Sequence, residues 1–373
     1  MSMQTARVAI VGAGLSGLYA AYLLEQRGIR NYVVFEARPE VGGRVVSVAP
    51  AGASPLERFD LGPSWFWPGY QRQLDRLVHD LGLKRFEQFE AGDMVMERSA
   101  KGPLTRSPGY LNAPPSMRLM GGMAALTDAL RERLDATRIR TGHKVTHLHR
   151  VNNHVQLHSV DASGSSTTWC VEHVLLALPP RLAETSIAFT PVLPPVLARQ
   201  WQGTATWMAP HAKYVAIYER PFWREQGLSG EARSVRGPLG EIHDASIPGG
   251  SAALFGFLGV PASMRQTVSE EQLRRLCRVQ LERLFGPEAA KPTAEFLKDW
   301  AQEPFTTTVA DQQGAAQHAQ APMPTADAGP WVGYLTGIGS EWSAQFPGYV
   351  AGAIEAASMG VQALLLRTEG APT

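Results

Sequence analysis

The chain has 373 residues, enough for two domains, and its 35 basic and 34 acidic residues leave a formal net charge of +1. This balance, with no basic stripe in the sequence, excludes an electrostatic nucleic-acid binder. The two cysteines, Cys170 and Cys277, are too far apart in sequence for a Cys-x-x-Cys motif. A disulfide framework and a cysteine-rich metal site are therefore excluded, and we expect a cytoplasmic protein without a bound metal.

The first 36 residues predict a strand, a helix and a second strand. Residues 7–11 are β-prone, residues 15–26 contain no helix breaker after Gly17, and residues 32–35 are again β-prone. A βαβ unit of this length begins a parallel sheet, so the fold class is expected to be α/β.

Helical and strand-like patterns alternate along the rest of the chain. Helices are predicted over residues 71–81, 121–134 and 269–285, and strands over 145–148, 155–160, 173–178 and 213–218. Asn152-Asn153 suits the turn of a hairpin. The segment 82–121 is rich in turn residues and is expected to hold little regular structure.

Two apolar stretches are not expected to span a membrane. Residues 8–24 are uncharged but contain three closely spaced glycines, and residues 350–366 contain Glu355 and two glycines. We expect the second stretch to be a buried helix, with Glu355 as a hydrogen-bonded structural acid.

Several histidines fall in the predicted hairpin. His143, His147 and His149 are expected on one face of its first strand, with His147 opposite His158. Solvated side chains explain them better than a metal site.

A glycine motif lies between the first strand and the first helix. Gly12-Ala13-Gly14-Leu15-Ser16-Gly17 has the spacing G-x-G-x-x-G. Such glycines permit a tight turn, close approach of the backbone to a pyrophosphate and close packing of helix on strand. Glu36, at the end of the second strand, is placed to bind ribose hydroxyls. The segment therefore predicts dinucleotide binding at a helix N-terminus.

The residues after Glu36 extend this motif. Glu36-Ala37-Arg38 followed by Gly42-Gly43-Arg44 resembles the E-x-R-x-x-x-G-G-R signature of the FAD-dependent amine oxidase superfamily. Four further blocks resemble the family in the same order: Asp60-Leu61-Gly62-Pro63-Ser64-Trp65, Arg118 to Leu130, Leu176-Ala177-Leu178-Pro179-Pro180, and Gly339-Ser340-Glu341 with Gly348-Tyr349-Val350-Ala351-Gly352-Ala353.

The resemblance implies FAD as cofactor and a set of residues that bind it. Besides the glycine motif, Glu36, Ala37, Arg38, Gly43 and Arg44, these are Gly62, Pro63, Ser64, Trp65, Val145, Pro179, Trp300, Gly339, Glu341, Tyr349, Val350 and Ala353. The segment after Trp300 contains no cysteine, so thioether attachment there is excluded and the FAD is expected to be noncovalent.

The resemblance also implies two catalytic residues. Family members use a lysine that holds a water at the flavin, ahead of a strand ending in Pro-Phe-Trp. Lys213 lies eight residues before Pro221-Phe222-Trp223 and matches this spacing. Tyr349 aligns with an aromatic residue that guides the amine. No tyrosine follows Trp300, so Trp300 or Phe305 is the candidate for the second cage aromatic.

One departure from the family concerns the substrate. Full-length amine oxidases carry a helical insert of about a hundred residues before the Gly-Gly helix, whereas this chain has only the segment 82–121 there. The cavity is expected to be shallow, open or closed by a partner subunit in a homodimer. The alternatives are a renalase-like or desaturase-like oxidoreductase on a non-amine substrate, and a flavin-binding partner protein without catalysis.

The expected architecture is therefore a Rossmann-like FAD-binding domain with a smaller α+β substrate domain. The FAD-binding domain is predicted to be discontinuous, over residues 1–75, 116–200 and 296–373. The substrate domain is predicted over 76–115 and 201–295. The expected reaction transfers hydride from the carbon beside an amine nitrogen to the flavin and reduces oxygen or another acceptor.

Overall fold

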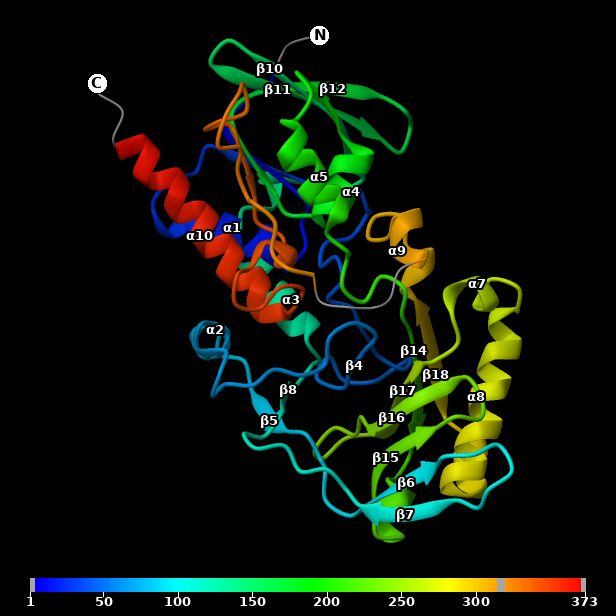
Figure 1. Cartoon of the computed structure of the whole chain (residues 1–373). Coiled ribbons are helices and arrows are strands. Elements are labelled where there is room, and N and C mark those ends of the chain that lie inside the picture. The colour runs from blue at the N-terminus through cyan, green and yellow to red at the C-terminus, as the bar shows by residue number, and fades with distance from the viewer. Residues whose placement is uncertain (1–3, 314–318, 370–373) are drawn as a thin grey trace. The chain divides into compact units, whose positions relative to one another are not determined.

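A computed structural model describes residues 4–313 and 319–369 of the chain. They form two compact units, each built from separate segments (Figure 1). The first comprises residues 1–45, 126–207 and 304–373, and the second comprises 46–125 and 208–303.

The first unit contains an eight-stranded sheet. Its order is β13-β10-β11-β12-β1-β2-β9, with β19 paired to β12. The strands are β1 (Gln4–Val11), β2 (Tyr32–Phe35), β9 (Ile139–Arg140), β10 (His143–Val151), β11 (His154–Asp161), β12 (Ser166–Leu176), β13 (Ala188–Thr190) and β19 (Leu335–Gly337). β1 pairs in parallel with both β2 and β12, which confirms the predicted βαβ unit.

Helices complete the first unit. They are α1 (Leu15–Gln26), α4 (Pro180–Ser186), α5 (Pro195–Gly203), α9 (Val309–Gln313) and α10 (Val350–Glu369), while α3 (Ala124–Glu132) begins at the boundary of the units. α10 packs along α1 (Figure 1). Its window Val350–Arg367 is long and apolar enough to cross a membrane, and half of that window is buried within the protein. Glu355 accepts hydrogen bonds from the Ser343 hydroxyl and the Gln345 N–H, which confirms its structural role.

The second unit contains a seven-stranded sheet of order β18-β14-β17-β16-β15-β6-β7. Its strands are β6 (Asp93–Glu97), β7 (Thr105–Pro108), β14 (Ala212–Tyr218), β15 (Leu228–Ser234), β16 (Leu239–Asp244), β17 (Ala252–Leu258) and β18 (Ala294–Asp299). Two small sheets pair β3 (Ser47–Val48) with β4 (Phe59–Asp60), and β5 (Arg85–Glu87) with β8 (Met117–Leu119). The helices are α2 (Arg72–Asp80), α6 (Phe222–Glu225), α7 (Ala262–Arg265) and α8 (Glu270–Phe285).

The sequence prediction was wrong for the segment 82–121. It contains the four strands β5, β6, β7 and β8, of which β6 and β7 extend the seven-stranded sheet. These strands are short, and tertiary pairing rather than an internal pattern determines them: β6 pairs with β15 and β7, and β5 pairs with β8.

The structure also divides the chain differently from the predicted domain boundaries. Residues 46–75, 116–125 and 296–303, predicted in the FAD-binding domain, belong to the second unit, and residues 201–207, predicted in the substrate domain, belong to the first. The reason is packing, because Phe59 and Leu61 are buried in one apolar cluster with Val215, Ile217 and Phe255 of the seven-stranded sheet.

The histidines of the hairpin do not all share one face. Asn152 adopts a φ of 46° at the predicted turn, and His147 lies opposite His158 as expected. A β-bulge between Val145 and His147, however, shifts the alternation of side chains. Val145 and Leu148 are both buried, so His143 lies on the face opposite to His147 and His149.

A buried ion pair ties α7 to the end of β18. Arg265 donates to both carboxylate oxygens of Asp299 at 2.8 and 2.6 Å, and the two side chains are only 1% and 6% exposed. Asp299→Ala leaves a buried guanidinium without its counter-charge, so we expect the free energy of unfolding to fall by about 3–5 kcal/mol. Denaturant titration of the purified variant measures this loss.

A matched control is available on the surface. Glu270→Ala removes the exposed partner of Arg274 and is expected to change the stability by about 1 kcal/mol or less. Equal effects of Asp299→Ala and Glu270→Ala would contradict a stabilising role for the buried pair.

Candidate functional site

The glycine motif of the first unit forms a tight turn between β1 and α1. Gly12 has a φ of +105°, and a Cβ atom built there would lie 2.7 Å from the Ala177 carbonyl oxygen. A Cβ atom on Gly17 would collide with the Gly12 carbonyl. Gly14 is the N-cap of α1 and supplies no side chain to the first turn, which contains no acidic residue. The turn therefore presents backbone N–H groups and the positive end of the helix dipole, as a pyrophosphate requires.

Glu36 and the second glycine pair pack against this turn. The Glu36 carboxylate, 4% exposed, accepts hydrogen bonds from the N–H groups of Ala13 at 2.8 Å and Arg38 at 3.0 Å. Gly42 donates to the Ala13 carbonyl at 2.8 Å, and a Cβ atom on Gly43 would lie 3.1 Å from the Gly14 Cα. The carboxylate is thus fixed beside the turn and keeps acceptor capacity for ribose hydroxyls.

Arg44 and Glu341 form a charged pair in the first unit. The Arg44 guanidinium contacts both Glu341 carboxylate oxygens at 2.5 and 2.9 Å and donates to the Ser340 hydroxyl at 3.1 Å. Burial disfavours the charged form of the Arg44 guanidinium, but the interaction with the Glu341 carboxylate favours it more strongly and raises the pKa of Arg44. The pair joins the E-x-R-x-x-x-G-G-R segment to the segment before α10, so two sequence blocks predicted to bind the cofactor meet here.

Other predicted cofactor residues lie at the ends of strands in the same unit. Val145 lies on β10, next to the stretch from His147 to His149 that pairs with β13, and its side chain is buried in the core of the unit. Pro179 follows β12 and caps α4. A Cβ atom on Gly339 would lie 2.9 Å from the Leu178 carbonyl oxygen. The segments that follow β12 and β19 are therefore adjacent. Tyr349, 39% exposed, directly precedes Val350, and Ala353 follows in the first turn of α10.

Lys213 is the central feature of the second unit. It lies on β14, is 1% exposed, and its Nζ donates to the Gly62 carbonyl at 3.1 Å and the Ser64 hydroxyl at 2.6 Å. The ammonium lies 4.0 Å from the centroid of the Phe255 ring. The structure thus brings together the predicted catalytic lysine and the segment Gly62-Pro63-Ser64-Trp65, which sequence reasoning placed next to the flavin.

Burial controls the charge of this lysine. Loss of hydration lowers the pKa of Lys213 to about 7, with Asp60 opposing this shift and Arg118 adding to it. Burial also raises the pKa of Asp60, although Lys213 and a hydrogen bond from Ser47 favour its charge. The pKa of Arg118 is lowered by burial. A lysine whose pKa lies near neutrality can exchange a proton with water at physiological pH.

Lys213 belongs to one face of the seven-stranded sheet, hereafter the Lys213 face. Side chains of cross-strand partners point to the same side of a sheet. The register therefore places Lys213 in a row with Phe257 and Glu241, and Val215 in the next row with Phe255 and His243. Four residues of this face were not predicted from the sequence: Phe255, Phe257, Glu241 and His243. In β16 and β17 they stand at every second position, which was the available signal that they share a face.

The candidate aromatic residues occupy different environments. Trp65 packs edge-on to His243 at 4.9 Å between ring centroids, and its indole N–H donates to Gln88. The Trp300 indole N–H donates to the Leu61 carbonyl at 3.0 Å, so Trp300 is held beside the segment before Gly62. Phe305 belongs to the first unit, where the Arg38 guanidinium lies 5.6 Å from its ring centroid.

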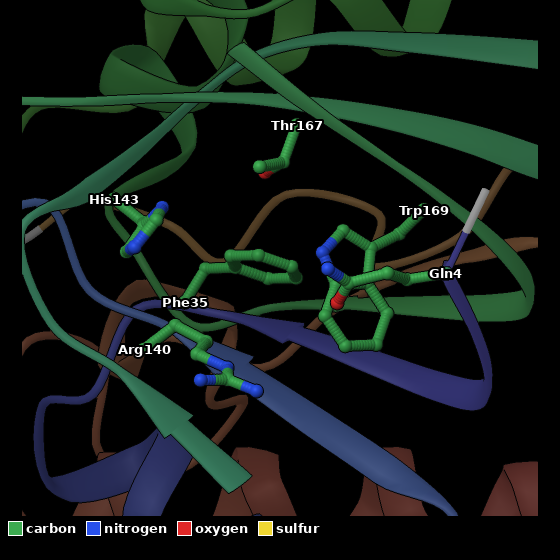
Figure 2. A pocket seen from close by; sticks show the side chains of 6 residues that line it. All are labelled: Gln4, Phe35, Arg140, His143, Thr167 and Trp169. Carbon is green, nitrogen blue, oxygen red and sulfur yellow. The ribbon is translucent and has the colours of Figure 1, made fainter. Parts of the chain in front are cut away.

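A small cavity lies in the first unit, beside the strand end that precedes Glu36. Its volume is about 110 Å³, and it is lined by Gln4, Phe35, Arg140, His143, Thr167 and Trp169 (Figure 2). None of these six was predicted as a site residue. Within residues 4–313 and 319–369, no group of three or more His, Cys, Asp or Glu side chains could hold a metal ion.

Comparisons with known proteins agree with this geometry. Residues 110–365 match the family described as flavin containing amine oxidoreductase, and residues 10–81 match a NAD(P)-binding Rossmann-like domain. A probable flavin-containing monoamine oxidase A of Dictyostelium discoideum is 23% identical over 454 residues, covering 93% of this chain and 95% of that protein. Putrescine oxidase of Kocuria rosea is 24% identical, covering 80% and 83%.

The fold is shared with solved structures. Wild-type putrescine oxidase bound to putrescine superposes with a TM-score of 0.79 at 21% identity, covering 98% of this chain and all of that one. The first family match covers more than half of the chain, and the glycine turn, Glu36 and the Arg44 pair fit a dinucleotide. The chain therefore belongs to the flavin-containing amine oxidoreductases and is an FAD-dependent enzyme.

Proposed function

We propose that this protein oxidises small amines, with Lys213 as the polar group that serves the reacting centre. The observation that carries this proposal is the buried Lys213 amine, held by Gly62 and Ser64 on an otherwise mainly apolar part of its sheet face. A lysine buried at such cost in hydration, with a pKa of about 7, is typical of a functional rather than a structural group.

FAD, held noncovalently, would supply the hydride acceptor for the carbon beside the amine nitrogen. The turn from Gly12 to Gly17 would bind its pyrophosphate, Glu36 its ribose, and the backbone of Val145 on β10 its adenine. Arg44 and Glu341, fixed by each other, would complete the site ahead of α10, whose N-terminus favours negative charge.

The chain's own side chains would perform the remaining tasks. Lys213 would hold a water molecule and exchange a proton with it, since its amine titrates near neutral pH. Tyr349 would orient the substrate, and Trp300 or Phe305 would supply the second aromatic surface. The product imine would be hydrolysed by water to a carbonyl compound and ammonia or a smaller amine.

The substrate is a small amine that reaches an open site. The alignment with the Dictyostelium discoideum oxidase spans 454 positions, whereas this chain has 373 residues, so part of that relative has no counterpart here. We expect oxygen to be the electron acceptor and a cytoplasmic location, with the protein acting as a monomer or a homodimer and without a membrane or nucleic-acid partner.

Product analysis tests this proposal. The holoenzyme is incubated in air with primary alkylamines, aromatic amines, diamines and amino acids, and carbonyl product and hydrogen peroxide are quantified. We expect one amine class to give carbonyl product and peroxide in equal amounts. Absence of a carbonyl product with every amine would contradict the proposal and favour a non-amine substrate.

A further inference from the structure

A carboxylate and an imidazole lie together on the Lys213 face, two strands away from the lysine. Glu241 and His243 are both on β16, and the His243 Nε2 is 2.6 Å from the Glu241 Oε1. β17 separates β16 from β14, so their backbones are about 10 Å from that of Lys213. The His243 side chain is 16% exposed, so its ring is only partly covered.

The hydrogen bond to Glu241 determines which nitrogen of His243 carries a proton. An ionised carboxylate only accepts, so Nε2 must donate and the neutral ring keeps its lone pair on Nδ1. Among the residues that the structure describes, none makes a hydrogen bond to Nδ1. The ring is fixed by Trp65, 4.9 Å between centroids, and by Phe255, with which it stacks at 5.4 Å.

The second carboxylate oxygen of Glu241 is also occupied. Arg233 on β15 donates to the Glu241 Oε2 at 2.5 Å, so the carboxylate is held from both sides. Interaction with His243 and Arg233 lowers the pKa of Glu241 against the opposing effect of burial, which keeps it ionised. The arrangement orients an imidazole through a fixed carboxylate, as in an acid–base pair of an enzyme.

A small alkylamine at neutral pH is an ammonium ion, whereas hydride loss from the carbon beside nitrogen requires the nitrogen lone pair. We propose that His243 is the proton acceptor that converts the bound ammonium into the neutral amine, with Glu241 as its positioning residue. The proton moves from the substrate nitrogen to Nδ1, giving R–CH₂–NH₂ and an imidazolium. This inference rests on the proposed function of the same site.

The charged groups around the pair are consistent with this direction of proton transfer. Glu241 faces His243 from the same strand, and Arg233 faces Glu241 from β15. Lys213, Asp60 and Arg118 are further titratable groups near this face. Phe255 on β17 and Trp65 contribute no charge. Glu241 is the ionised group in contact with the ring.

The test is the rate of flavin bleaching by limiting amine in the anaerobic holoenzyme, measured from pH 6 to pH 10. His243→Phe keeps an aromatic ring against Trp65 and Phe255 but removes the proton acceptor. We expect this rate constant to fall about 100-fold at pH 7. The deficit should shrink with unit slope as pH approaches the pKa of the amine, where neutral substrate accumulates.

Two controls separate this role from a structural one. An amine carrying three fluorines on its β carbon is already mostly neutral at pH 7, and the variant should oxidise it at the wild-type rate. Glu241→Gln should show the same pH-dependent deficit in smaller measure. A pH-independent loss with both kinds of amine, or no loss at all, would overturn the assignment. If the wild type bleaches with no amine, the proposed function itself fails.

Discussion

Lys213→Met is expected to lower kcat for the best amine in air about 100-fold, with FAD still bound. Methionine fills nearly the same volume among Val215, Phe255 and Phe257, so packing is retained. What is lost is the amine that Gly62 and Ser64 hold and that exchanges protons near neutral pH. Steady-state oxygen consumption gives kcat, and the visible spectrum gives the FAD content.

A matched control is an exposed lysine of the same unit. Lys291 lies between α8 and β18 and is exposed to solvent. Lys291→Met should leave kcat within about twofold, because surface substitutions away from a site change little. An equal loss of kcat in the two variants would contradict a catalytic role for Lys213.

The same variant also reports the charge of the lysine through stability. In the unfolded chain the ammonium keeps its proton up to about pH 10.5, whereas in the folded protein its pKa is about 7. Between these values the unfolded state binds more protons, so the wild type becomes more stable as pH rises. From pH 7 to pH 9 we expect the wild type to gain about 2–3 kcal/mol relative to Lys213→Met, measured by denaturant unfolding of the apoprotein. A constant difference would mean that the buried amine keeps its proton.

Glu341→Ala is expected to give the largest loss of cofactor binding. It leaves the Arg44 guanidinium without its carboxylate partner, next to the turns that would bind FAD. The Arg44 side chain is 24% exposed and recovers part of the lost energy from water. We therefore expect a destabilisation of about 2–4 kcal/mol together with release of FAD on dilution. Thermal unfolding and ultrafiltration of the yellow protein measure the two effects.

The double variant Arg44→Met with Glu341→Leu separates stability from binding. Replacing both charges by apolar groups should restore most of the thermal stability, because no buried charge is left unpaired. FAD affinity should remain low, since the predicted cofactor contacts of both residues are gone. Recovery of full FAD affinity in the double variant would show that the pair acts only as a structural support.

The nucleotide half of the site was predictable because its chemistry is local in sequence. The glycine turn, Glu36 and the second glycine pair lie within 32 residues. Gly12, Gly17 and Gly43 each permit a close backbone approach that the structure contains. The spacing of Lys213 from Pro221 was likewise a local signal. In these cases a short stretch of chain dictates both the conformation and the chemistry.

The remaining parts of the site depend on pairing between distant strands. Glu241 and His243 share a sheet face with Lys213 only because β16 and β14 both pair with β17. The alternation within each strand does not give the register of these pairings. The strands β5 to β8 were missed for the same reason, and the bulge that separates His143 from His147 leaves no pattern in the sequence. Which residues face a site is a property of the sheet and not of any one strand.

The most direct test of amine oxidation is anaerobic mixing of the holoenzyme with single amines while the flavin absorbance is followed. This measurement depends on neither oxygen nor the fate of the imine. We expect one class of small amine to bleach the flavin completely, and NAD(P)H to leave it oxidised. Bleaching by NAD(P)H but by no amine would contradict the account and assign the Lys213 face to a different oxidoreductase chemistry.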